Sequence, residues 1–142
     1  MTRSSAGTFR YSPKNNGSMR RRDGGTTEWW LVIDCDPELG RYFRHLYQRS
    51  RWNTVVPREP LWGVHISVVR DEQPPAMSAW KSLEGQAVEF DFAEEVTDME
   101  GYLWVAVGCE VALDHRVELG LEREPWPPLH MTVGNFTHEA TT

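Results

Sequence analysis

From residue 28 onward, the hydrophobic positions change repeatedly between the spacing of strands and the spacing of helices. Short apolar or alternating runs, bounded by Gly, Pro or Asp, have the length of strands. The runs expected to form strands are 29–34, 61–70, 86–92, 102–109 and 129–136. The acidic stretch 94–101 is expected to connect two of them. The pattern therefore predicts an α+β domain.

Two longer segments have helical spacing. The first begins at Asp36-Pro37, with Asp as N-cap and Pro at the first helical position, and ends near Arg49–Arg51. Its apolar side chains form one stripe that consists of Leu39, Tyr42, Phe43, Leu46 and Tyr47. The second helix covers Val111–Leu119 and is stopped by Gly120. A short helix over Met77–Leu83 is also expected.

Residues 1–27 differ in composition from the remainder of the chain. They are rich in Gly, Ser, Thr, Asn and Arg and have little hydrophobic periodicity, so we expect a flexible tail before one folded domain at 28–142. The cluster Arg20, Arg21, Arg22 is interpreted as a solvated basic arm, with contact to nucleic acid or phosphate as the alternative.

The domain contains two similar strands, each carrying one histidine. The first reads Trp-Gly-Val-His-Ile-Ser-Val over 62–68, and the second reads Pro-Pro-Leu-His-Met-Thr-Val over 127–133. Because side chains alternate along a strand, His65 and Ser67 share one face, and His130 and Thr132 share one face. One such motif is a weak signal. Two copies, 65 residues apart and each following a helix, indicate an approximate internal duplication and one shared site.

Two imidazoles and two hydroxyls suit the chemistry of a phosphodiester. One histidine takes a proton from the attacking oxygen and the other protonates the leaving oxygen, which imidazole does near neutral pH. Ser67 and Thr132 would donate hydrogen bonds to the phosphate oxygens, where negative charge develops. This chemistry needs no metal ion or other cofactor, and none is expected. The pattern does not say which histidine is the base.

The paired motifs His65-Ile66-Ser67 and His130-Met131-Thr132 resemble the signature of the 2H phosphoesterase superfamily. The likeness covers roughly residues 28–138 and leaves the tail unexplained. It implies a bilobed fold with two pseudo-symmetric lobes, mainly antiparallel sheets and a central cleft. It also implies that His65 and His130 are the catalytic acid and base and that Ser67 and Thr132 bind the phosphate. The first hydroxyl is Ser here, where many members of the superfamily have Thr.

The resemblance leaves several substrates open. Members of the superfamily act on 2′,3′-cyclic phosphates, on 2′-5′ linkages and on cyclic oligonucleotide second messengers, and the last group includes viral anti-CBASS proteins that destroy host immune signals. A phage-type phosphodiesterase for cyclic oligonucleotides is the first hypothesis. An RNA 2′,3′-cyclic phosphate or 2′-5′ phosphodiesterase is the second. A module that sequesters a nucleotide without cleaving it is the third.

Further candidates surround the motifs. Trp126, four residues before His130, is expected at the rim of the cleft as a stacking partner for a base. Of Trp29 and Trp30, which face opposite ways, only one reaches the cleft; the pattern does not decide between them, and Trp30 is retained as the candidate. Gly63 and Gly134 would leave room for the ligand beside each histidine. Arg70 falls on the face opposite His65 by alternation.

Composition adds several expectations. The net charge of −6 divides into +5 for residues 1–27, from six Lys or Arg and one Asp, and −11 for the remainder. The negative charge of residues 28–142 argues against binding of long double-stranded nucleic acid but is compatible with binding of a small phosphorylated ligand. Buried reduced thiols are expected for Cys35 and Cys109. Surface positions are expected for His45 and His115, and mobility is expected for His138 near the C-terminus. With no long apolar run and no signal-peptide core, we expect a cytoplasmic protein without membrane partners.

Overall fold

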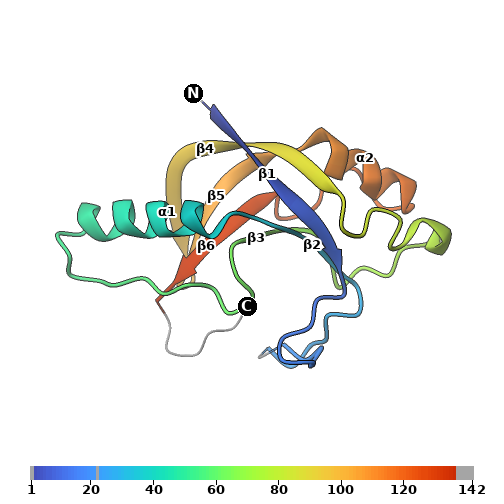
Figure 1. Cartoon of the computed structure of the whole chain (residues 1–142), viewed down its shortest axis with the longest axis horizontal. Helices are drawn as coiled ribbons and strands as arrows, with labels where there is room; N and C mark the ends of the chain where they lie inside the picture. The colour runs from blue at the N-terminus through green and yellow to red at the C-terminus, as the bar shows by residue number, and fades with distance from the viewer. Residues whose placement is uncertain (1, 22, 137–142) are drawn as a thin grey trace.

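Six antiparallel strands close into a barrel in the order β1-β2-β3-β6-β5-β4 (Figure 1). The computed structural model describes residues 2–21 and 23–136. The elements are β1 (Thr2–Tyr11), β2 (Trp30–Asp34), α1 (Pro37–Ser50), β3 (His65–Arg70), a 3-10 turn (Met77–Ala79), β4 (Ala87–Met99), β5 (Tyr102–Gly108), α2 (Glu110–Glu118) and β6 (His130–Asn135). The fold is therefore mixed α/β with a mostly antiparallel sheet.

The chain consists of two halves with the same order of elements. Strand, strand, helix and strand follow one another as β1-β2-α1-β3 and again as β4-β5-α2-β6. The halves join at two seams, where β1 pairs with β4 and β3 pairs with β6. The second seam brings together the two strands that carry the histidine motifs.

The prediction of a flexible tail was wrong, because β1 is a full member of the barrel. It pairs with β2 along Thr8–Tyr11 and with β4 along Thr2–Thr8. Only Phe9 and Tyr11 bring large buried side chains. Most of the strand consists of small or polar residues, and backbone hydrogen bonds to two neighbours hold it in place. The pattern of hydrophobic residues in the sequence therefore does not predict such a strand.

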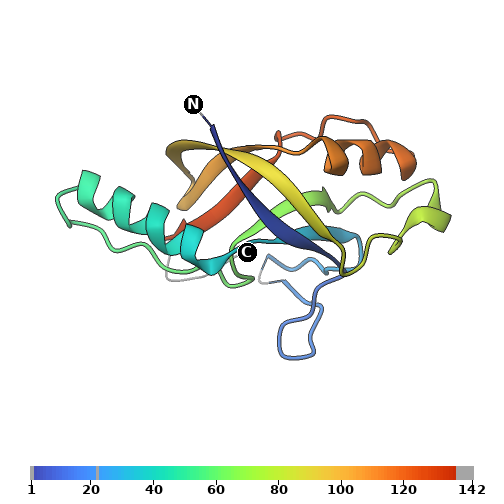
Figure 2. The same cartoon turned by 45° about the horizontal axis from the view of Figure 1, so that its top comes forward.

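The two helices form where they were predicted and lie at opposite ends of the barrel (Figures 1 and 2). Asp36 caps α1 by accepting a hydrogen bond from the Glu38 backbone N–H. Of the predicted apolar stripe, Phe43 and Tyr47 are buried, whereas Tyr42 and Leu46 are largely exposed. The helix therefore meets the barrel along a narrower face than its sequence suggests.

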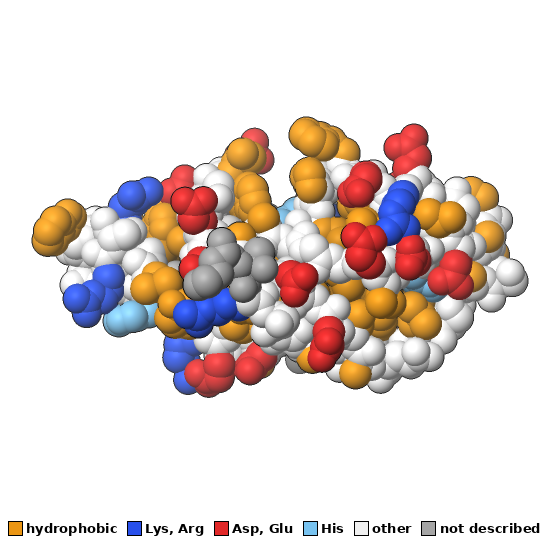
Figure 3. All heavy atoms as spheres, turned by 90° about the horizontal axis from the view of Figure 1, so that it is seen from above, with side chains coloured by type: hydrophobic (Ala, Val, Ile, Leu, Met, Phe, Trp, Pro, Cys, Tyr) orange, Lys and Arg blue, Asp and Glu red, His pale blue; other side chains and the backbone are white. Residues whose placement is uncertain are grey.

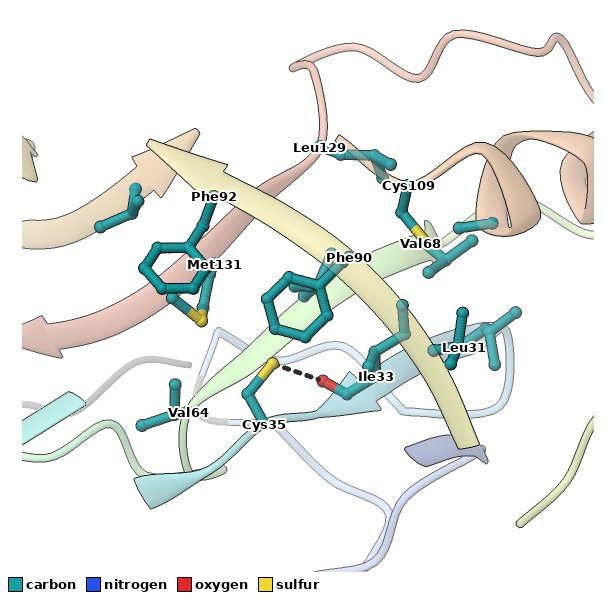
Figure 4. Packing of buried hydrophobic residues seen from close by; sticks show 14 of the residues in the cluster. Leu31, Ile33, Cys35, Val64, Val68, Phe90, Phe92, Cys109, Leu129 and Met131 are labelled. Atoms are coloured by element: carbon teal, nitrogen blue, oxygen red, sulfur yellow. Dashed lines mark hydrogen bonds between the residues drawn. The ribbon is translucent and has the colours of Figure 1, made fainter. Parts of the chain in front are cut away.

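The main core fills the barrel interior. Phe90 and Phe92 of β4 point inward toward Ile33 of β2 and Met131 of β6 (Figure 4). As predicted, Val88, Phe90 and Phe92 alternate with exposed Glu89 and Asp91. Cys35 and Cys109 are buried free thiols, also as predicted. None of the helices in the described part of the chain is long and apolar enough to cross a membrane.

Several expected boundaries change. β4 continues through the acidic stretch to Met99, because its charged side chains face solvent, and it turns at Glu100 and Gly101, both at positive φ. β3 begins only at His65, since Gly63 adopts a φ of +78° that no strand residue has. The segment 77–83 forms only the single 3-10 turn Met77–Ala79 followed by further turns.

Candidate functional site

The two histidine motifs lie side by side on neighbouring strands. In the seam between β3 and β6, His65 pairs with Thr132 and Ile66 pairs with Met131. Ile66 and Met131 are fully buried inside the barrel, so the alternate side chains project from its outer surface. Because directly opposed side chains in antiparallel strands are about 5 Å apart, the two imidazole–hydroxyl pairs form one cluster.

Both imidazoles are held by the same local hydrogen bond. His65 Nδ1 lies 2.7 Å from the carbonyl oxygen of Gly63, and His130 Nδ1 lies 2.8 Å from that of Pro128. A carbonyl oxygen only accepts, so Nδ1 carries the proton in each ring. Nε2 is then the basic atom of each neutral ring. The segments before the two strands thus set the tautomer and orientation of both histidines.

A β-bulge follows the hydroxyl residue in each strand. Leu31 and Val32 are consecutive in β2 but pair with Val69 and Ser67, so Val68 is an extra residue in β3. In β6, Val133 is the extra residue, because Leu103 and Trp104 pair with Gly134 and Thr132. A bulge shifts the alternation of all later residues. Val68 and Val133 still point into the core, as simple alternation predicts, but the expected face of every later residue in the two strands is reversed.

This reversal corrects the predictions for Arg70 and Gly134. Arg70 lies on the same outer side as His65, with its guanidinium carbon 5.6 Å from the centre of the Trp30 ring. Gly134 is buried away from the site, where an added Cβ would lie 3.0 Å from the Arg44 side chain. Gly134 therefore leaves room for a helix side chain from the other half and not for a ligand.

The surroundings of the two histidines differ strongly. His65 is only 3% exposed, and its ring lies 5.5 Å from the ring of Trp30 in an edge-on contact. Burial lowers the pKa of His65 to about 4, although the hydrogen bond to Gly63 opposes this shift. The positive charge of Arg70 lowers the pKa further, whereas the nearby carboxylate of Asp34 raises it. His65 is consequently neutral near pH 7.

His130 instead faces a pocket with a volume of about 740 Å³. His130 and Thr132 line this pocket together with Tyr102, Trp104 and Trp126. Trp104 contacts the His130 ring at a centroid distance of 5.5 Å. Among the described residues, His65 and Ser67 do not line the pocket; they lie behind its wall, beside Thr132. In Figure 3, acidic side chains are spread over the face of the molecule seen from above.

Trp30 and Gly63 have positions different from those predicted. Trp30 is fully buried and does not line the pocket. Its Nε1 donates a 2.9 Å hydrogen bond to Ser67 Oγ, so it positions a site residue instead of contacting a ligand. Gly63 does not line the pocket either; its positive φ aims its carbonyl at His65. Trp126 is 90% exposed at the pocket rim, as the sequence suggested.

Sequence reasoning overlooked two kinds of residue at this pocket. Tyr102 and Trp104 alternate with the buried Leu103 in β5, and this alternation is the signal in the sequence that could have placed them on the outer face. Asp23 and Arg70 also line the pocket. No signal in the sequence indicated Asp23, because its segment was expected to be flexible.

The remaining histidines lie outside this cluster. His45 is exposed, as predicted, and His138 lies outside the described residues. The prediction for His115 was wrong: it is fully buried, and its Nε2 lies 2.6 Å from the Tyr11 hydroxyl. The described residues contain no group of three or more His, Cys, Asp or Glu arranged to hold a metal ion.

The chain was also compared with known proteins. Searches against protein-family models, curated proteins and solved structures found no match. The candidate site is therefore argued from its own geometry.

Proposed function

We propose that the protein is a metal-independent phosphodiesterase of the 2H type that cleaves nucleotide phosphodiester bonds. The observation that carries this proposal is the pairing of the two motif strands, which places His65 opposite Thr132. The matching Nδ1 hydrogen bonds add to it, because they present a basic Nε2 from both rings. In this proposal the two halves correspond to the two lobes of the 2H fold, and the seam between β3 and β6 corresponds to its central cleft.

The different surroundings assign different roles to the histidines. His65 is buried and neutral at pH 7, with a pKa of about 4, so it serves as the proton acceptor. His130 lines the pocket, where a leaving oxygen would reach it, and serves as the donor. Both roles require the scissile phosphate to bind at the seam, against Thr132.

The hydroxyl of Ser67 is oriented for phosphate binding. Its oxygen already accepts a hydrogen bond from Trp30 Nε1, which leaves its own hydrogen to be donated elsewhere. Thr132 contributes the second hydroxyl from the pocket wall. Hydrogen-bond donors that are already positioned where negative charge develops typically stabilise the transition state more than donors that must first reorient.

Aromatic side chains at the pocket favour a nucleotide as the ligand. Trp104, Trp126 and Tyr102 offer flat surfaces next to His130, and stacking on a base contributes about 1–3 kcal/mol. Cyclic oligonucleotide immune signals, degraded by a phage protein in immune evasion, are the first substrate class of this proposal. The alternative substrates are RNA ends with a 2′,3′-cyclic phosphate, or 2′-5′ linkages.

For a 3′-5′ bond the ribose 2′-hydroxyl is the nucleophile. Its oxygen attacks phosphorus while its proton passes to His65 Nε2. The bond from phosphorus to the 5′ oxygen breaks, and this oxygen takes a proton from His130. The products are a 2′,3′-cyclic phosphate and a free 5′-hydroxyl.

The decisive experiment is product analysis by mass spectrometry over a substrate panel. The panel contains cyclic di- and trinucleotides, RNA ending in a 2′,3′-cyclic phosphate and 2′-5′-linked dinucleotides, each with and without EDTA. We expect His65→Ala and His130→Ala to lower turnover by about 10²–10⁴-fold. His45→Ala, at an exposed position of α1, is the matched control. Full turnover by both variants, or loss of all turnover with EDTA, contradicts the proposal.

One observation favours a second candidate function, the sequestering of a nucleotide without cleavage. The pocket is lined by His130 and Thr132, whereas His65 lies behind its wall. For such a module, nucleotides bind with no product formed, and His130→Ala weakens binding while His65→Ala does not. The same substrate panel distinguishes the two functions.

A further inference from the structure

A cluster of two arginines and one aspartate adjoins the pocket that contains His130; Asp23 and Arg70 line this pocket, and Arg21 lies behind them against Asp23. Arg70 Nη2 donates a 3.0 Å hydrogen bond to Asp23 Oδ2, and Arg21 Nε lies 3.2 Å from Asp23 Oδ1. The backbone N–H of Gly25 donates a third contact to Asp23, at 2.9 Å. One carboxylate thus connects two guanidinium groups, and Asp23 and Arg70 both line the pocket.

Arg21 is unusually buried for a residue of this kind. Its side chain is 4% exposed, and among the described residues Nε and Nη1 have no hydrogen-bond partner of good geometry although both are buried. Nη2 donates to Asp71 at 2.8 Å. The chain turns tightly around the guanidinium, since a Cβ on Gly25 would lie 2.1 Å from Arg21 Nη2. Buried guanidinium donors that lack acceptors are costly, and an additional anion would satisfy them.

The cluster is connected to the proposed catalytic residues. The guanidinium carbons of Arg21 and Arg70 lie 5.9 and 5.6 Å from the centre of the Trp30 ring. Trp30 in turn donates to Ser67. Asp23 and Arg70 line the same pocket as His130 and Trp126.

We propose that Arg21 and Arg70 form a second phosphate site, and that Asp23 occupies this site until a phosphate of the ligand displaces its carboxylate. This inference rests on the proposed function for the first phosphate, at the seam between β3 and β6. Arginine forks bind carboxylate and phosphate with the same geometry, and phosphate brings more acceptor oxygens. The site makes the pocket selective for ligands with two phosphates, as cyclic oligonucleotides have.

The state of Asp23 agrees with this exchange. Burial alone would raise the pKa of Asp23, but the Gly25 hydrogen bond and the charges of Arg21 and Arg70 outweigh it and hold the pKa below its ordinary value. The carboxylate is therefore charged at neutral pH and competes with a phosphate. Because residues 28–142 carry a charge of −11, binding a second phosphate needs local cations of this kind.

Binding of nucleoside phosphates tests the inference without any turnover. Each common nucleoside 3′,5′-bisphosphate and the matching 3′-monophosphate are titrated calorimetrically into the wild type, Asp23→Asn, Arg70→Ala and Arg41→Ala. Arg41 pairs with Glu38 on the exposed side of α1 and provides a matched loss of charge. Thermal unfolding of each variant checks that it is folded.

We expect the wild type to bind a bisphosphate about tenfold more tightly than its monophosphate. Asp23→Asn tightens bisphosphate binding several-fold, because the competing carboxylate is gone. Arg70→Ala reduces the affinity for the bisphosphate to that for the monophosphate, and Arg41→Ala changes neither affinity. Unchanged or weaker bisphosphate binding by Asp23→Asn, equal losses for both ligands in Arg70→Ala, or no binding at all overturns the inference. Failure of the proposed function is a separate result, the absence of phosphodiester turnover by the wild type.

Discussion

His65 and His130 occupy equivalent positions in the two halves, yet the structure gives them different environments. Each donates from Nδ1 to the carbonyl two residues earlier, so the local geometry is the same. The Trp30 ring packs edge-on against His65 of the first motif, and His65 is buried. The second motif opens into the pocket. Burial thus gives two copies of one motif different environments, so that His65 is enclosed and neutral near pH 7 and His130 lines the pocket.

The buried histidines make stability depend on pH. The pKa of His65 is lowered by burial from 6.5 to about 4, and burial also lowers the pKa of His115. Below pH 6.5 the unfolded chain takes up these protons and the folded chain does not, so the free energy of unfolding decreases as the pH falls toward 4. For His65 the loss is about 3 kcal/mol.

Urea unfolding between neutral pH and pH 4.5 measures this dependence. His65→Asn keeps a donor near the Gly63 carbonyl but has no titrating group, so its stability should fall less steeply than that of the wild type. A slope equal to that of the wild type would show that His65 is not the titrating group.

Trp30 is expected to act on catalysis through Ser67. Trp30→Phe removes the Nε1 donor and keeps most of the buried ring, so the free energy of unfolding should decrease by about 1 kcal/mol. Turnover should fall several-fold with little change in KM, because the Ser67 hydroxyl loses the contact that orients it. In a Ser67→Ala background the effect on turnover should disappear. Losses that add fully in the double variant would exclude this coupling.

At the scale of elements, each helix supports a strand of the opposite half. Arg44 of α1 donates a 2.7 Å hydrogen bond to the carbonyl of Val133, the bulged residue of β6. Arg116 of α2 donates a 2.8 Å bond to the carbonyl of Val68, the bulged residue of β3. A bulge leaves its backbone groups without a strand partner, and these arginines satisfy them. Each bulge sets which residues of its motif strand face outward, and each is therefore stabilised by the helix of the other half.

Removing these arginines should weaken the seam. Arg116→Met loses the bonds to Val68 and Glu122 and the ion pair with Glu72, so the free energy of unfolding should decrease by about 2–4 kcal/mol. Arg44→Met should cost about 1 kcal/mol. Urea denaturation measures both, with Arg41→Met on the exposed side of α1 as the control. Losses no greater than those of the control would contradict a supporting role.

The sequence predicted those elements whose stability depends on apolar side chains in a regular pattern. The helices, their caps, and the strands around Ile33, Phe90 and Leu103 follow from periodicity. β1 was overlooked because its stability derives from backbone pairing, which leaves no trace in hydrophobicity. The bulges were overlooked because one extra residue in a strand looks like continued alternation, and Arg70 and Gly134 were assigned to the wrong faces for this reason.

At the scale of the whole molecule, closure of the barrel depends on β1. Gly7 lies beside the end of β2, and a Cβ there would be 2.5 Å from the backbone oxygen of Asp34. Gly7→Val should therefore decrease the free energy of unfolding by about 2 kcal/mol or more. Ala6→Val, one position away and facing solvent, should have an effect near zero. Thermal unfolding distinguishes them, and equal melting temperatures would show that the close approach is unimportant.

Because each half stabilises the other, the stability of either half alone would be lower than that of the joined pair. A single strand-strand-helix-strand unit would have two unpaired sheet edges. Its helix arginine would have no bulge carbonyl to bond, and its own bulge carbonyl would have no arginine partner. A second unit of the same kind pairs with both edges, and each helix arginine then bonds the bulge of the other unit. The chain thus resembles a dimer of two similar small units joined by residues 71–86, and its two histidine motifs lie side by side because each unit brings the same strand to their common border.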